Sequence, residues 1–226
     1  MLQSVSRKFR SGCMMLMREE ENHLSFLGSA FLVHQDGYLL TAAHLVANSD
    51  NLMIVPSNYT DDFIPMTFER VAAMPAAVVS RDRNADVALL KLEQEISISV
   101  PDDFLGATDH VTPGTSIMSL GYSFGHEQLH AILNYSGVVT GKIRSPNNTG
   151  LILFDKMIYD GDRGGPLVHV ADGHIMGIVS GRFEPEEVVR GSQDWDRPLP
   201  SNTSVSYAVA IEYGIALMEA EGLFAH

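Results

Sequence analysis

The sequence predicts an all-β protein built from two six-stranded antiparallel β-barrels with a C-terminal helix. Short runs of β-branched or alternating apolar residues recur along the chain, bounded by Gly, Pro, Asn and Asp as strands usually are. About six such runs lie on each side of a turn-rich gap at Pro101–Gly114, a division that fits two barrels better than one sandwich. Hairpin signals separate neighbouring runs in both halves, at Asp36-Gly37 and at Asp172-Gly173.

Residues 1–105 are expected to form the N-terminal barrel. Their apolar positions follow the period of two that places alternate side chains on one face of a strand. Turn residues separate the runs, and the Asp36-Gly37 turn joins the second run to the third. The expected strands are Met14–Arg18, Ser25–His34, Leu39–Thr41, Asn51–Val55, Met66–Ser80 and Val87–Leu92.

Residues 106–226 are expected to form the C-terminal barrel and the helix, and the two halves together make one functional domain. The segment Val209–Glu221 has apolar residues at helical spacing and stops before Gly222. Residues 184–203 are rich in Glu, Asp, Pro, Ser and Gly, so we expect an irregular loop in which Trp195 is a packing anchor. The expected strands are Ser116–Gly121, Leu129–Ile143, Gly150–Phe154, Leu167–Val170, Ile175–Arg182 and Ser204–Ala208.

The charge of the chain restricts its partners. A net charge of −13 with no basic stripe argues against a nucleic acid and against an anionic membrane surface. The apolar run Cys13–Met17 is too short, and too soon followed by charges, for a signal peptide. We therefore expect a cytoplasmic protein, unless an export signal has been trimmed. Cys13 is the sole cysteine, so no intrachain disulfide forms, and we expect it to be a buried small hydrophobe.

Three segments of the chain indicate a specific chemistry. Residues 37–44 read GYLLTAAH, residues 84–92 read NADVALLKL and residues 159–167 read YDGDRGGPL. Together, and in this order, they resemble the trypsin-like serine peptidases, and residues 119–125 (SLGYSFG) are similar to the HtrA-type (DegP-like) branch. The resemblance covers about residues 12–221. It implies the chymotrypsin-like double barrel.

The resemblance implies that His44 is the general base and that Asp86 orients it. A serine hydroxyl needs an adjacent imidazole to take its proton, and the imidazole needs a carboxylate on its other nitrogen. The order His, Asp, nucleophile along the chain is that of the chymotrypsin-like fold. Arg163 stands where the nucleophilic serine is expected, and an arginine cannot attack a carbonyl. We therefore expect an inactive site, since losing the nucleophile lowers turnover by a factor on the order of 10⁶.

Binding elements are also implied by the resemblance. The backbone amides of Gly161 and Arg163 stand where the family forms its oxyanion hole, which binds a carbonyl or carboxylate oxygen. Val179, Ser180 and Gly181 would line an edge strand to which a peptide adds by β-pairing. The expected partner is therefore a peptide or protein segment between the barrels. HtrA relatives are often trimers, so the resemblance leaves a homo-oligomer open.

Three side chains near the nucleophile position keep alternative roles. Met157 would lie at the base of the specificity pocket and favour an aliphatic or aromatic side chain, and it fits a place in the core equally well. Asp162 stands where HtrA-type chains usually carry Asn, and it either accepts loop amides or pairs with an arginine. Arg163 is either a solvated arginine on a degenerated site or a residue with a specific role.

A second motif competes with this interpretation. His126, Glu127 and His130 match H-E-x-x-H, in which two histidines on one helical face bind zinc. Glycines precede the motif and the residues after it favour a strand, where positions four apart are separated by about 13 Å. We therefore expect a chance match, with no metal and no cofactor.

Three hypotheses for the function follow. The first is a pseudo-protease that binds peptide segments between the barrels. The second is a genuine serine endopeptidase inactivated by an introduced substitution at position 163. The third is an assembly or interaction domain in which the crevice has no role. A zinc protease built on His126, Glu127 and His130 is a further, weaker alternative.

Overall fold

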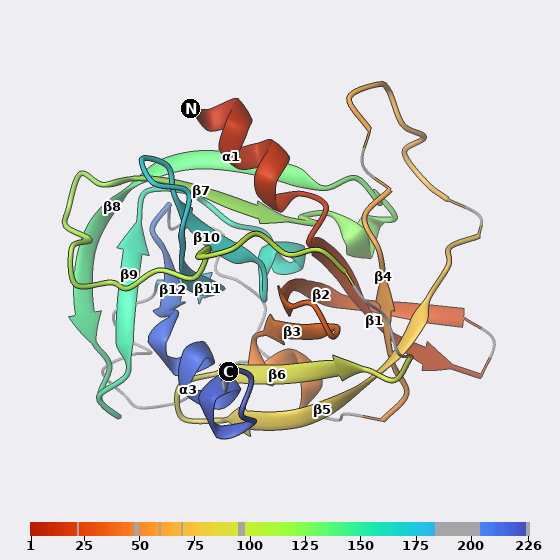
Figure 1. The fold of residues 1–226 in the computed structure, drawn as a ribbon. Helices are drawn as coiled ribbons and strands as arrows, with labels where there is room; N and C mark the ends of the chain where they lie inside the picture. The colour runs from red at the N-terminus through yellow and green to blue at the C-terminus, as the bar shows by residue number, and fades with distance from the viewer. Residues whose placement is uncertain are drawn as a thin grey trace.

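The chain folds into two closed, six-stranded antiparallel β-barrels with a C-terminal helix, as expected (Figure 1). The computed structural model describes residues 1–224 except 22, 48–49, 59, 69, 95–97 and 184–203. The strand order is β1-β2-β3-β6-β5-β4 in the first barrel and β10-β11-β12-β9-β8-β7 in the second. The expected loop at 184–203, with Trp195, lies outside the described residues.

All six strands expected in the first half are present, and one of them starts later than expected. Residues 66–73 were assigned to the fifth strand, but the strand begins at Met74. Met66 O accepts a hydrogen bond from His130 N (3.0 Å), and Phe68 N donates to His130 Nδ1 (3.3 Å). This stretch therefore bonds to the second half of the chain instead of extending the sheet. The strands are β1 (Cys13–Glu20), β2 (His23–His34), β3 (Tyr38–Thr41), β4 (Leu52–Val55), β5 (Met74–Asp82) and β6 (Val87–Leu92).

The second barrel also has its six strands, and the largest difference from a predicted boundary is at the start of β8. Residues 129–132 were assigned to a strand, but the chain turns back after the 3-10 helix η2 (Gly125–Glu127), where Gln128 has φ +62°. Val209 and Ala210 were assigned to the helix, yet they pair with β11. Such fully buried apolar residues have no strand alternation to distinguish them from a helix. The strands are β7 (Ser116–Gly121), β8 (Leu133–Arg144), β9 (Gly150–Phe154), β10 (Pro166–His169), β11 (Ile175–Arg182) and β12 (Ser206–Ala210).

Each terminal helix packs on the barrel that is farther away in sequence. Helix α1 (Leu2–Phe9), which the sequence analysis did not predict, buries Val5 and Phe9 and contacts β7 of the second barrel (Figure 1). Helix α3 (Glu212–Ala220) follows the second barrel and contacts β5 and β6 of the first. It ends as expected before Gly222, whose φ is +74°. The two helices thus connect the barrels on opposite sides.

The apolar core is continuous across the two barrels. One cluster of buried side chains includes Met15 and Phe31 from the first barrel with Leu120 and Ile178 from the second. Cys13 belongs to it, fully buried as expected, and burial raises the pKa of its thiol well above its usual range. Separating the barrels would expose this shared core, so their relative position is strongly constrained.

The connection between the barrels runs beside β11, and the boundary at residues 105/106 stays a prediction. Ile175 N donates to Phe104 O and Gly106 N donates to Ile175 O, both at 2.8 Å. These bonds hold the connection against the second barrel. Among the described residues, no helix combines the length and the apolar character needed to cross a membrane.

Candidate active site

His44 and Asp86 meet because their strands are neighbours. His44 lies on the 3-10 helix η1 (Ala43–Val46) just after β3, and Asp86 directly precedes β6. The antiparallel pairing of β3 with β6 brings these two ends together. His44 Nδ1 lies 2.9 Å from Asp86 Oδ2 and 3.0 Å from Oδ1. Both side chains are nearly inaccessible, with exposed fractions of 5% for His44 and 1% for Asp86.

The Asp86 carboxylate is bound by the backbone N–H of His44 as well as by the His44 imidazole. Its Oδ1 accepts the backbone N–H of His44 at 2.9 Å, and its carbonyl accepts that of Ala43 at 3.2 Å. Asp86 has φ +59°, a left-handed conformation that is uncommon for a residue other than glycine. Because Nδ1 faces the carboxylate, the ring presents Nε2 as the nitrogen that would take a proton.

The loop at 159–165 is bound to the first barrel through Ser29 of β2. Ser29 N donates to Arg163 O at 2.8 Å, and Ser29 Oγ donates to Gly161 O at 2.7 Å. Gly164 has φ +82°, and a Cβ there would overlap Ser29 O and the side chain of Thr41. That Cβ would also lie 3.1 Å from Leu45, the neighbour of His44 in sequence. Position 163 is thus held at the junction of the barrels, on a loop bound to β2.

Arg163 is folded back onto its own loop. Its side chain is 11% exposed, and its Nη2 lies 3.7 Å from Asp160 Oδ1. Its backbone N–H donates to Asp160 O at 3.3 Å, which closes the 3-10 helix η3 (Asp160–Asp162). In this conformation the amide is occupied by Asp160, although the resemblance implied a role for it in an oxyanion hole together with Gly161.

Asp162 accepts hydrogen bonds from an amide and a hydroxyl. Its Oδ1 accepts Ser123 Oγ at 2.6 Å and its Oδ2 accepts Tyr159 N at 2.8 Å. The side chain is buried, and burial raises its pKa to about 6, partly offset by these two bonds and by Lys156 and Arg182. The first of the two roles left open for Asp162, acceptance of loop amides, is the one observed.

The expected substrate-binding residues lie along the end of β11. Strand β10 pairs with β11 only as far as Ile178. Val179 then bonds to the loop, accepting from Gly164 N at 2.7 Å and donating to Gly165 O at 2.9 Å. Gly181 and Arg182 are paired with β12 on their other side, and the buried Ser180 lies at a register shift between Val179 and Gly181.

Arg182 is a residue of this region that sequence reasoning missed. Its Nε donates to Ile158 O at 2.8 Å, and its guanidinium lies 5.9 Å from the centre of the Tyr159 ring. Met157, the expected base of the specificity pocket, is the half-buried residue before Ile158. Arg182 therefore joins the β11 edge to the segment that carries Met157. Its position directly after the expected edge residues was the only signal in the sequence.

The H-E-x-x-H residues do not share a helical face. His126 lies on η2, which Gln128 ends, and its ring packs edge-on against Phe26 at 4.9 Å. His130 Nδ1 accepts the backbone N–H of Phe68. Within the described ranges, the single group of three or more side chains arranged to hold a metal lies elsewhere, at His110, His169 and Asp172.

The sequence matches one protein family and a set of named relatives. Residues 28–178 match the trypsin-like peptidase domain family. A protein of Pseudomonas fulva (strain 12-X) named "Probable periplasmic serine endoprotease DegP-like" is 32% identical over 160 residues, which cover 70% of this chain and 29% of the relative. A protein of the same name from Hahella chejuensis (strain KCTC 2396) is 31% identical over 156 residues, covering 68% and 29%. The chain spans less than a third of the length of these relatives.

Solved structures show the same fold. The HtrA-type protease AlgW with a tripeptide superposes with a TM-score of 0.73 at 20% identity, covering 97% of this chain and 63% of that one. AlgW with a decapeptide gives a TM-score of 0.71 at 20% identity, covering 100% and 68%.

Replacing Gly164 tests how tightly the loop is held against β2. Gly164→Ala is expected to destabilise the protein by about 3 kcal/mol or more. The new methyl group would overlap Ser29 O and the Thr41 side chain, and the left-handed backbone at this position is unfavourable for alanine. Gly114→Ala is the matched control, since Gly114 has φ +91° with no atom within 4 Å of a new Cβ. It should cost about 1 kcal/mol. Urea unfolding measures both, and equal losses would contradict close contact at Gly164.

The raised pKa of Asp162 predicts a pH-dependent stability. The folded protein holds this proton more tightly than the unfolded chain, so the stabilisation is complete below about pH 4 and is lost as the pH rises through about 6. Asp162→Asn keeps a neutral side chain, so its stability relative to the parent should increase by about 2–3 kcal/mol between pH 4 and 7. Chemical unfolding at several pH values measures this. A stability difference between Asp162→Asn and the parent that does not change with pH would refute the prediction.

Proposed function

The chain belongs to the trypsin-like peptidase domain family, in its HtrA/DegP-like branch, and we propose that it is a pseudo-protease that binds extended peptide segments between its barrels without cleaving them. The observation that carries this proposal is the position of Arg163. It lies on the loop bound to Ser29, and the resemblance to the family implies a nucleophile at this position. A guanidinium supplies no hydroxyl or thiol to form an acyl-enzyme.

The loop conformation supports an inactive site. The Arg163 amide donates to Asp160 O, and the Arg163 side chain lies near the Asp160 carboxylate. Both contacts favour the closed η3 turn. An oxyanion hole needs its amides directed at the developing negative charge, and losing one such donor costs about 10²–10³ in rate. A serine at position 163 would therefore still lack part of the machinery.

Peptide binding is proposed from the edge of β11. Beyond Ile178 this strand no longer pairs with β10, and an extended segment could pair along residues 180–182. The AlgW structures that share this fold contain a tripeptide or a decapeptide. Carried over to this chain, that observation supports a peptide as the class of ligand.

A second candidate is a genuine endopeptidase in which an introduced arginine has replaced the serine. The intact bond between His44 and Asp86 favours it, since a general base and its orienting carboxylate are both in place. The two candidates differ in the activity that they predict for a protein with serine at position 163.

The compartment is also a proposal. The apolar run Cys13–Met17 forms part of β1 inside the first barrel, so it belongs to the folded domain. We propose the cytoplasm as the location of this protein, whereas the two relatives are named as periplasmic proteins. Cell fractionation decides between these compartments.

Restoring the serine separates the two candidates. The parent protein should show no fluorophosphonate labelling and no casein hydrolysis. Arg163→Ser should label at least about 100-fold more slowly than an active HtrA-type peptidase, because the amide of residue 163 is bonded to Asp160 O. Melting temperatures show that both proteins are folded. Labelling of Arg163→Ser at the rate of the active enzyme, with casein cleavage, would replace the pseudo-protease proposal by the second candidate.

The Arg182 bond to Ile158 is expected to oppose peptide binding. Arg182→Ala removes this hydrogen bond between the β11 edge and the segment that carries Met157. A fluorescein-labelled casein peptide should then bind about 2- to 10-fold more tightly, a change in affinity that corresponds to the net free energy of about one hydrogen bond. Fluorescence anisotropy measures the affinity, and Arg81→Ala, at an exposed position of β5, is the control. If no peptide binds to the parent or to either variant, the result would contradict peptide binding and favour the assembly or interaction domain.

A further inference from the structure

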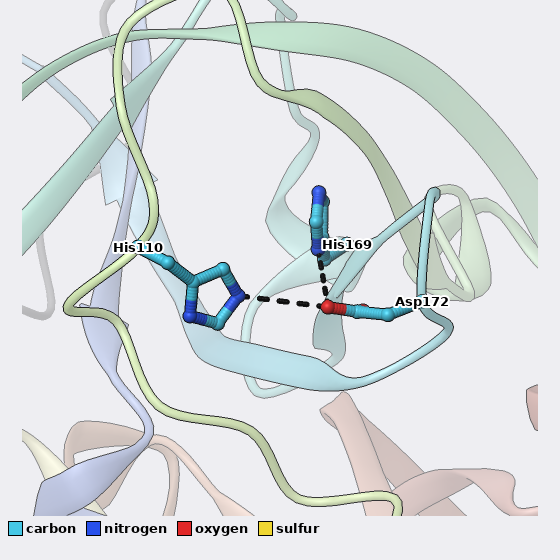
Figure 2. Close-up of side chains that lie close together, drawn as sticks. All are labelled: His110, His169 and Asp172. Carbon is cyan, nitrogen blue, oxygen red and sulfur yellow. Dashed lines mark hydrogen bonds and ion pairs between the residues drawn. The ribbon is translucent and has the colours of Figure 1, made fainter.

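Three side chains converge at the surface of the second barrel (Figure 2). His169 ends β10, Asp172 lies in the turn before β11, and His110 comes from the connection between the barrels. Their potential ligand atoms all lie within 4.8 Å of one another. The connection and the hairpin are about 60 residues apart in sequence, so the fold itself assembles this group.

Asp172 is the centre of the group, and its two oxygens have different partners. Oδ2 lies 2.7 Å from His169 Nδ1 and 3.5 Å from His110 Nε2, as the dashed lines in Figure 2 show. Oδ1 accepts the backbone N–H of His174 at 3.0 Å and lies 3.2 Å from His174 Nδ1. His174 therefore orients the carboxylate through one oxygen and leaves the other facing two imidazoles. A partner that orients a ligand in this way is typical of metal sites.

The spacing suits a tetrahedral ion. Ligands bonded at about 2.0–2.1 Å in a tetrahedron lie about 3.3 Å apart. The 3.5 Å between His110 and Asp172 already matches this, and the 2.7 Å between His169 and Asp172 must open by a small side-chain rotation. The exposed fractions are 53% for His110, 16% for His169 and 33% for Asp172, so solvent reaches the group and can supply a fourth ligand.

The donor chemistry selects the class of ion. Two imidazoles with one carboxylate favour zinc and similar transition metals, whereas calcium and magnesium prefer sites made of oxygen ligands. The strongly negative protein also attracts cations, at a net charge of −13.

We propose that His110, His169 and Asp172 bind one Zn²⁺ ion that fastens the connection between the barrels to the β10–β11 hairpin. Lys8 of α1 donates to Gly173 O in the same turn at 2.9 Å, so the hairpin also contacts the N-terminal helix. The ion would stabilise the point where three segments meet. This site is separate from the proposed peptide-binding function and does not depend on it.

Isothermal titration of ZnCl₂ into metal-free, tag-free protein tests the proposal. One saturable site per chain is expected, with a rise of roughly 5–10 °C in melting temperature at about 100 times the Kd. His169→Ala and Asp172→Asn should each weaken binding at least about 100-fold, and His174→Ala, which removes only the orienting partner, about 10-fold. Melting temperatures without zinc show whether each variant is folded.

Two controls locate the ion. His34 and Asp36 form a His–Asp pair, 3.5 Å apart, at the β2–β3 hairpin of the first barrel, so His34→Ala should leave binding unchanged. The double variant His126→Ala/His130→Ala should also bind normally, which excludes the H-E-x-x-H segment. The proposal is overturned if no saturable binding occurs, if His169→Ala binds as the parent does, or if the double variant loses the ion.

Discussion

Ser29 joins the two barrels at the point where the site is assembled. Its backbone N–H and its hydroxyl donate to Arg163 O and Gly161 O, its Oγ accepts Tyr122 N, and its carbonyl accepts Thr41 Oγ1. These groups are buried, and leaving any of them without a partner would cost about 1–3 kcal/mol. The loop around position 163 is therefore held in one place relative to the first barrel, whichever side chain position 163 carries.

This arrangement explains how the scaffold of a peptidase persists around an arginine. The backbone bonds of the loop, the positive φ of Gly164 and the bonds of Asp162 to Ser123 and Tyr159 do not involve the side chain of residue 163. His44 and Asp86 are likewise fixed by the pairing of β3 with β6. The chemistry at position 163 can thus change while the surrounding geometry stays the same.

Other features of the molecule act on the same junction. A shared apolar core fills the space between the barrels, and each terminal helix packs on the barrel that is more distant in sequence. The histidine group at Asp172 lies where the inter-barrel connection passes the β10–β11 hairpin. A rigid junction suits a binding site formed from both barrels, because little ordering would be required when a ligand enters.

The sequence by itself determined the two barrels, most strand boundaries and the pairing of His44 with Asp86. Strand periodicity and turn residues are local signals, and the motifs that contain His44 and Asp86 lie at the ends of adjacent strands. Only the tertiary structure decided the late start of β5, the packing of α1, the partners of Asp162 and the inward fold of Arg163. Most of these outcomes depend on contacts between residues far apart in the chain, such as Met66 with His130 or Ser29 with Gly161. Arg163 contacts nearby Asp160, but its loop is also docked on the opposite barrel through Ser29. Periodicity and composition carry no information about such docking.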